Sequence, residues 1–336
     1  MILYDDLGTG KAVCDCPAAA RFDLSCTWQQ STQRLHSRRH YSRVLHAMFE
    51  WTINRRRFVV RNLETIAEFH EVEDIQREAW LFSDLDVVPA ATMIATGHAG
   101  GQLLGAFEGS KMIGFVYGFP AHENGRVSIH SHMLAVRPEY RNFQAGYQLK
   151  LAQRKDALAR GIDEITWTYD PLQTLNAHLN FGKLGVVSSK YFVNFYGEET
   201  SSPLHRGFGT DRLWVSWLLN SDHVKRRISN EEQTIPPEGL FSDSKGGAPE
   251  SALVYREGDL PRVRDFAGPL AGRICIIEIP AGINEIKERD PAAALSWREA
   301  TRAAFQTALA SGFIVEDFIR AGDNSPRWFY LLKREH

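Results

Sequence analysis

Hydrophobic and polar residues follow a regular pattern only from about residue 57 onward. Residues 1–56 show no sustained period of 2 or 3.6, and they contain the basic, histidine-rich run RLHSRRHYSRVLH. Because such a stretch offers little apolar surface for a core, we predict a disordered leader over residues 1–56. The regular pattern starts about ten residues after Met48, so we also hypothesise that translation begins at that methionine.

The first part of the regular region predicts a helix followed by a hairpin. Apolar residues at helical spacing indicate an amphipathic helix, which Thr65 or Glu64 can open. Two apolar runs, QLLGAFE and KMIGFVYGFP, joined by Gly109 and Ser110, are typical of paired strands. The buried stripe of the helix is expected to consist of Ile66, Phe69, Val72, Ile75 and Ala79.

The pattern of the next two segments predicts a strand and then a long helix. In the run RVSIHSHMLAV, strand alternation places Val127, Ile129, Met133 and Ala135 on one face, and Ser128, His130, His132 and Leu134 on the other. A helix should follow from Pro138 and end at Gly161. We expect its buried stripe to be Tyr147, Leu151, Leu158 and Ile162, with Lys150, Gln153, Arg154 and Asp156 turned to water.

The remaining pattern suggests a sheet with helices on both faces and a C-terminal extension. A strand (EITWTYD), a helix (LQTLNAHLNFGKLG) and two strands (SKYFVNFYG and DRLWVSWLL) complete a domain over residues 57–220. Residues 221–252 are polar and rich in proline, glycine and serine, as in a linker. Residues 253–336 predict a β-α-β-β extension, which is too short to bury its own core comfortably and should pack on the preceding sheet. The fold class is therefore α/β of the α+β type, with a mixed sheet.

Composition narrows the classes of partner. The 39 basic residues against 41 acidic ones give a net charge of 39 − 41 = −2, which does not favour nucleic acid. No apolar run approaches the roughly 20 residues of a membrane-spanning helix, and the first residues lack the apolar core of a secretory signal. We therefore expect a cytoplasmic protein that acts on a small molecule, with no nucleic acid, membrane or metal partner, and leave a homodimer open. The four cysteines imply no disulfide framework.

The succession of strand, arginine-containing turn, long helix, strand and second helix resembles the GCN5-related N-acetyltransferases (GNAT). The resemblance covers about residues 57–220 and is sharpest in SHMLAVRPEYRNFQAGYQLKLAQR, in ITWTYDPLQTLNAHLNFGKLG, and in NFYG and TDRLWVSW. These segments look like a branch of large bacterial members with a C-terminal extension. The resemblance implies a mostly antiparallel sheet and an acyl-coenzyme A co-substrate, with acetyl as the expected acyl group.

In this family the turn before the long helix binds the pyrophosphate of coenzyme A through backbone N–H groups and the helix N-terminus. Arg141 and Gly146 match the family motif, whereas Gln144 stands where a glycine is usual. A non-glycine residue there costs on the order of 1 kcal/mol, so we expect an adjusted turn rather than a lost one. The implied cofactor-binding residues are Leu134, Ala135, Val136, Arg141, Asn142, Phe143, Gln144, Ala145, Gly146, Tyr147, Asn176 and Phe181.

Transfer to an amine requires a base, because an amine with a pKa of about 10.4 is protonated at neutral pH. His132 and His130 are the first candidates and Asp170 the second; each could equally be a structural residue. The family tyrosine that assists the leaving thiolate is replaced here by Phe181, so either Tyr169, Tyr191 or Tyr196 substitutes for it, or the thiolate leaves unaided with stabilisation from the backbone or a helix end. Arg206, Arg212 and Lys190 are candidates for binding a substrate carboxylate.

The resemblance thus suggests an acyl-coenzyme A-dependent N-acyltransferase of a small-molecule amine, such as an amino acid. Two alternatives remain open. One is succinyl transfer to an amino acid. The other is a non-catalytic coenzyme A-binding regulatory protein, which the departures at Gln144 and Phe181 motivate.

Overall fold

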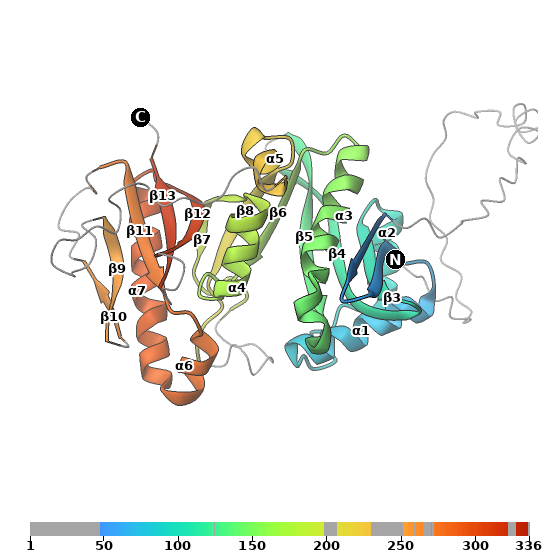
Figure 1. The fold of residues 1–336 in the computed structure, drawn as a ribbon, viewed down its shortest axis with the longest axis horizontal. Coiled ribbons are helices and arrows are strands. Elements are labelled where there is room, and N and C mark those ends of the chain that lie inside the picture. The colour runs from blue at the N-terminus through green and yellow to red at the C-terminus, as the bar shows by residue number, and fades with distance from the viewer. Residues whose placement is uncertain are drawn as a thin grey trace, which may run out of the picture. The chain divides into compact units, whose positions relative to one another are not determined.

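The computed structural model describes residues 48–123, 125–197, 207–229, 251–258, 260–264, 270, 272–321 and 327–334 (Figure 1). Its strands are β1 (Phe49–Ile53), β2 (Arg56–Asn62), β3 (Gln102–Glu108), β4 (Lys111–Glu123), β5 (Arg126–Val136), β6 (Glu164–Tyr169), β7 (Val187–Phe192), β8 (Arg212–Leu218), β9 (Ala252–Glu257), β10 (Leu260–Val263), β11 (Ile274–Ile279), β12 (Ile314–Arg320) and β13 (Trp328–Lys333). Its helices are α1 (Ile66–Trp80), α2 (Ala90–His98), the 3₁₀-helix η1 (Pro138–Phe143), α3 (Ala145–Ala159), α4 (Thr174–Ala177), the π-helix η2 (His178–Leu184), α5 (Asp222–Ile228), α6 (Ile283–Arg289) and α7 (Pro291–Ala310).

The described strands form one mixed, mostly antiparallel sheet, in agreement with the fold class predicted from the sequence. Its strand order is β1-β2-β3-β4-β5-β6-β8-β7-β12-β13-β11-β9-β10. Only the pairs β5–β6 and β9–β11 run parallel. The C-terminal extension joins the sheet edge to edge, through the pairing of Val315 on β12 with Ser188 on β7. It therefore lengthens the sheet rather than only covering its face.

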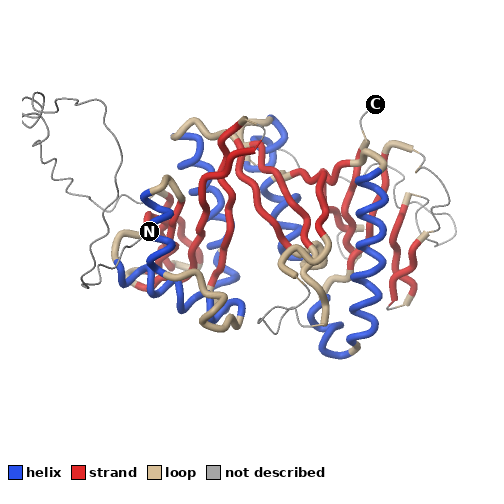
Figure 2. The backbone as a smooth tube through the Cα atoms, turned by 180° about the vertical axis from the view of Figure 1, so that it is seen from behind, coloured by secondary structure: helices blue, strands red, loops and turns tan. Residues whose placement is uncertain are grey.

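Helices cover both faces of the N-terminal part of the sheet. Helices α1 and α2 bury Val72, Ile75 and Met93 against one face, in a cluster that includes Phe115 of β4. Helix α3 buries Leu149 and Ala152 against the opposite face. The two views from front and back show α3 on one side of the strands and α1 on the other (Figures 1 and 2). Of the two residues predicted to open α1, Thr65 caps it, in a capping box with Glu68. The stripe predicted for this helix is wrong at Ile66, which is exposed in the first turn.

A third cluster joins the C-terminal extension to β6 and β8. Trp297 and Phe305 of α7, together with Tyr330 of β13, are fully buried in the same cluster as Phe181 and Trp217. The extension thus shares a core with the rest of the sheet. None of the helices in the described part of the chain is both long and apolar enough to cross a membrane.

Two predicted boundaries need correction. Strand β1 falls within the range assigned to a leader, because it pairs antiparallel with β2 from Phe49 to Ile53. A strand at the edge of a sheet needs only one apolar face, which a short run such as FEWTI shows weakly. Helix α5 likewise lies at the start of the predicted linker, where Ser221 caps it through a bond from the Val224 amide.

Candidate functional site

The centre of the sheet contains two parallel strands that pair at only two positions. Ile129 of β5 pairs with Ile165 of β6, and His130 pairs with Thr166. Beyond these pairs the strands diverge (Figures 1 and 2), while Ser131 and residues 133–136 remain paired with β4 on their other edge. No other strand of the described chain enters the gap. The backbone edge of β5 facing β6 can therefore pair with an extended ligand, in the way that a peptide adds to a sheet edge.

A β-bulge at His132 changes which side chains of β5 share a face. Tyr117 of β4 pairs with Met133, but the next residue, Gly118, pairs with Ser131, so His132 is the extra residue. As a result Ile129 packs with Ala157 of α3, whereas Met133 and Ala135 pack in the cluster of α1 and α2. The strict alternation predicted for these residues is wrong because a single inserted residue reverses it.

Helix α3 begins immediately after the divergent part of β5. The segment Pro138–Phe143 forms η1, and Gln144 then adopts the left-handed conformation with φ 59° and ψ 13°. Gln144 thus adopts a backbone conformation that glycine takes most easily. Among the residues that the structure describes, no side chain caps α3, and the first N–H groups of a helix have no intrahelical partner. Gly146 lies in this first turn, and Ala145 beside it is buried. Such a helix end favours an anion.

Residues distant in sequence hold this turn in place. The indole Nε1 of Trp51 on β1 donates to the carbonyl oxygen of Phe143 at 2.8 Å. The guanidinium of Arg56 lies 4.5 Å from the centroid of the Phe143 ring. Arg137, just before η1, donates to Glu71 and Glu78 of α1. Sequence reasoning missed Trp51, because its strand had been assigned to the leader; only the three-dimensional pairing reveals its role.

The two histidines of β5 have different surroundings. His130 is buried, with its Nδ1 3.1 Å from Thr166 Oγ1 and its ring 4.9 Å from that of Trp214. Burial, together with the nearby His132 and Lys150, lowers the pKa of His130 from 6.5 to about 4. The His130 imidazole is therefore neutral at physiological pH and is better placed to support the sheet than to exchange protons with solvent.

His132 is accessible at the bulge. Its side chain is exposed, although the rings of Tyr117 and Phe119 lie 6.0 and 5.6 Å away. Desolvation by these neighbours lowers the pKa of His132 from its usual value. An accessible histidine that is neutral near pH 7 can accept a proton.

Two other catalytic candidates do not fit the roles considered for them. Asp170 is buried, accepts from Arg298 of α7 at 2.8 Å and caps a turn through the Leu172 amide. Burial would raise its pKa, but Arg298, Arg212 and the Leu172 amide together hold the pKa below its usual value, which removes Asp170 as a base. The hydroxyl of Tyr169 is buried 2.9 Å from that of Tyr330, and burial raises its pKa far above 10. It is not available to a leaving thiolate.

The late helix also differs from the expectation. Phe181 is fully buried, 5.7 Å from the Tyr330 ring of the extension, so the C-terminal core occupies its surface and Phe181 does not face the gap. Asn176 is exposed on α4. Of the three substitute tyrosines, Tyr191 bonds to Asp211 at 2.6 Å, whereas Tyr196 is exposed and its hydroxyl lies 3.4 Å from Thr168 on the divergent part of β6. Tyr196 is therefore the tyrosine of the three with access to solvent beside the divergent strands.

Of the three basic residues considered for a substrate carboxylate, Lys190 and Arg212 already have partners within the protein. Lys190 forms an ion pair with Glu123 at 2.7 Å. Arg212 is buried and donates to the carbonyl of Asp211, and its guanidinium lies 5.3 Å from the Tyr196 ring. Arg206 lies outside the described residues.

The buried stripe of α3 differs from the one predicted. Lys150 and Gln153, which had been expected to face water, are buried against β5. Lys150 Nζ donates to Ser131 Oγ at 2.8 Å and to Gln153 Oε1 at 3.2 Å, and it lies 3.7 Å from the centroid of the Trp167 ring. Burial lowers the pKa of Lys150 well below its usual value. The prediction that Lys150 and Gln153 face water is wrong because these side chains bond to each other and to Ser131 of β5, so they can be buried.

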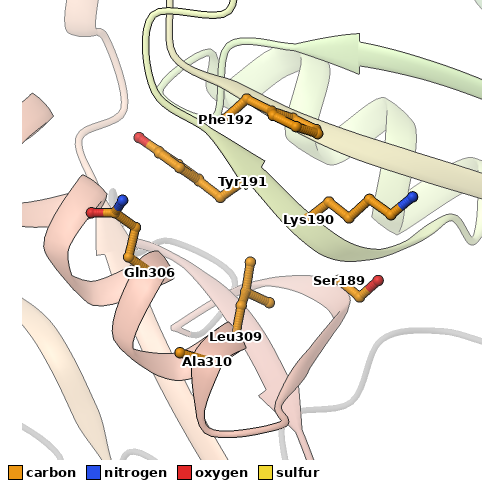
Figure 3. A pocket seen from close by; sticks show the side chains of 7 residues that line it. All are labelled: Ser189, Lys190, Tyr191, Phe192, Gln306, Leu309 and Ala310. Atoms are coloured by element: carbon orange, nitrogen blue, oxygen red, sulfur yellow. The ribbon is translucent and has the colours of Figure 1, made fainter.

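A separate groove of about 620 Å³ lies between β7 and α7 (Figure 3). Its walls are formed by Ser189, Lys190, Tyr191, Phe192, Gln306, Leu309 and Ala310. It includes neither histidine and neither divergent strand segment, so it belongs to the junction with the extension. Within the described ranges, no group of three or more His, Cys, Asp or Glu side chains is placed to hold a metal ion.

The sequence matches no protein-family model and no curated protein. Solved structures similar to the chain include an aminoglycoside 6′-acetyltransferase type Ii, with 18% identity over 48% of this chain and 97% of that one, at a TM-score of 0.39. Some of these structures are GNAT acetyltransferases. Others are the ribosomal-protein-S18-alanine N-acetyltransferase of Escherichia coli (14%, covering 55% and 99%, TM-score 0.39) and a GNAT acetyltransferase of Streptococcus pneumoniae (18%, covering 47% and 98%, TM-score 0.38).

Proposed function

We propose that this protein is an acyl-coenzyme A-dependent N-acyltransferase that acts on a small-molecule amine. The observation that carries the proposal is the divergence of β5 from β6 directly before the uncapped N-terminus of α3. An open strand edge and an anion-binding helix end, in sequence along one chain segment, suit a ligand that has an extended amide-containing arm and a pyrophosphate. The turn motif with Arg141 and Gly146 supports the same ligand.

The binding roles follow from the positions of these residues. The N–H groups of Ala145, Gly146 and Tyr147 would face the pyrophosphate, and the backbone of residues 131–136 would pair with the arm. Arg141 and Asn142 are exposed at the turn and could add contacts to phosphate. The bound thioester supplies the activated acyl carbon. Its position would fall near the bulge, because the arm runs along β5 away from the turn.

His132 is the proposed general base. The amine nitrogen bonds to the acyl carbon, the carbon–sulfur bond breaks, and the proton lost by the amine passes to the imidazole of His132. The lowered pKa of His132 keeps it unprotonated and ready for this step. A thiol has a pKa of about 8.5, so its thiolate is a tolerable leaving group, and Tyr196 is the exposed hydroxyl nearby that could protonate it.

The test measures both binding and turnover. Calorimetry with coenzyme A should show binding to the wild type, unchanged binding to His132→Asn, and loss of binding to Gly146→Glu. A carboxylate in the first turn stabilises the helix but repels a pyrophosphate, so Gly146→Glu should remove binding without impairing folding. Gly146→Gln, which has a side chain of similar size and no charge, is the control for steric effects. Free thiol released with a panel of amines should fall by about 10²–10⁴-fold in His132→Asn.

Each other result has a defined meaning. Binding without thiol release from any amine would favour the regulatory alternative. Binding that survives Gly146→Glu would place coenzyme A elsewhere and contradict the proposed site. An undiminished rate in His132→Asn would remove His132 as the base.

A further inference from the structure

The amine of Lys150 lies where β5 and β6 begin to diverge. Ser131, which accepts from Lys150 Nζ at 2.8 Å, is the first residue of β5 beyond the last pair with β6. Trp167, whose ring centroid is 3.7 Å from Nζ, is the first residue of β6 beyond that pair. The lysine therefore contacts both strands at the narrow end of the gap, on the side of α3.

The groups that contact the Lys150 amine among the described residues are neutral. They are a serine hydroxyl, an amide oxygen of Gln153 and an aromatic face, and no carboxylate of the described residues bonds to it. A buried ammonium without a counterion is costly, so such a group stays neutral or awaits an anion. An apolar side chain would fill the same space without the free-energy cost of burying an amine. Packing alone therefore does not explain why a lysine occupies this position.

We infer that Lys150 binds a carboxylate at the far end of the acyl group, so that the donor is a coenzyme A thioester of a short dicarboxylic acid. This inference rests on the proposed function. With the pyrophosphate at α3 and the arm along β5, the acyl group reaches the narrow end of the gap, where the buried amine of Lys150 lies. A carboxylate there forms a charge-assisted hydrogen bond and compensates the buried ammonium; an acetyl methyl group does neither.

The experiment compares the affinities of coenzyme A, acetyl-, malonyl- and succinyl-coenzyme A by calorimetry. The wild type should bind malonyl- or succinyl-coenzyme A about tenfold or more tightly than acetyl-coenzyme A. Lys150→Met should abolish this preference and leave the affinity for coenzyme A itself unchanged. Lys155→Met, which changes an exposed lysine of the same helix, should behave as the wild type.

A second neutral variant, Lys150→Gln, can keep a bond to Ser131 and guards against a folding defect in Lys150→Met. The inference is overturned if acetyl-coenzyme A binds the wild type as tightly as both dicarboxylic thioesters. It is also overturned if the preference persists in both neutral variants. In either case the proposed function survives, provided coenzyme A binds. If coenzyme A fails to bind the wild type, the proposed function and the inference are both wrong.

Discussion

Two buried basic side chains on helices that pack against the sheet, Arg298 and Lys150, differ in how their charge is compensated. Arg298 of α7 is fully buried and pairs with the buried carboxylate of Asp170 at 2.8 Å. Burial alone would lower the pKa of Arg298, but Asp170, with Tyr191 and Asp211, more than compensates and the pKa is raised. Lys150 of α3 is buried to a similar extent with neutral partners alone, and its pKa falls. The charge supplied by the chain thus distinguishes a group that holds the fold together from one suited to a ligand.

The regions around Arg298 and Lys150 also differ in whether the protein itself supplies partners for their polar and charged groups. Asp170 and Arg298 lie where the extension joins β6, in a core that also contains the bonded pair Tyr169 and Tyr330. Lys150 lies where β5 and β6 separate. Charges inside the first region are matched within the chain, whereas the second keeps an open strand edge, an uncapped helix end and an unmatched amine. Binding sites are expected to keep such unsatisfied groups.

The largest effect should come from breaking the matched pair. Arg298→Met leaves the carboxylate of Asp170 buried without its cation, so the free energy of unfolding should fall by about 3–5 kcal/mol. Urea unfolding measures this change. Arg57→Met is the control, because Arg57 pairs with Glu50 on the surface and such pairs contribute about 0–1 kcal/mol. A loss in Arg298→Met no greater than in Arg57→Met would contradict the structural role of the pair.

An intermediate effect is expected from pH at His130, which lies beside the divergence. The folded pKa of about 4 is below the unfolded value of 6.5, so the unfolded chain binds more protons and stability falls as pH falls through this window. Between pH 7 and 5 the wild type should lose about 2 kcal/mol more than His130→Gln, whose amide can keep a bond to Thr166. Urea midpoints at the two pH values measure the difference. Parallel pH dependence in the two proteins would show that His130 is not buried as a neutral group.

The smallest effect should come from Lys150→Met in the absence of ligand. Ser131 Oγ still donates to Gln153 Oε1 at 2.9 Å, so removing the amine leaves neither atom unsatisfied. Replacing an uncompensated buried amine by an apolar residue should change the free energy of unfolding by no more than about 1 kcal/mol, or raise it. Thermal or urea unfolding of the free protein gives the value. A loss as large as that of Arg298→Met would mean that Lys150 is structural, and the comparison would fail.

Elements whose structure depends on neighbouring residues were predicted from the sequence better than elements that depend on distant segments. The strands from Gln102 to Glu108 and from Arg126 to Val136, and the helix beginning after Thr65, agree closely with the pattern, because strand alternation and caps are local properties. The edge strand β1 was missed because its stability comes from pairing with β2 and from the bond of Trp51 to the turn. The bulge at His132 was missed for a similar reason, since register depends on the partner strand.

The candidate site was predictable to a more limited degree. Local sequence indicated the turn around Gln144 and Gly146 and the two histidines, and the structure distinguishes the buried His130 from the accessible His132. Asp170, Tyr169 and Phe181 were misjudged, because residues of the extension more than 120 positions away cover or bind them. No local pattern carries that information.

By itself, the sequence determined most of the succession of strands and helices and the presence of a turn between β5 and α3. These depend on the periodicity of apolar residues, on caps and on turn chemistry, which act over a few residues. Tertiary structure alone decided where β5 and β6 separate, which polar residues of α3 are buried, and which buried charges find partners. These outcomes depend on contacts between distant segments, and burial, rather than residue type, sets whether a lysine is a solvated surface group or a site for an anion.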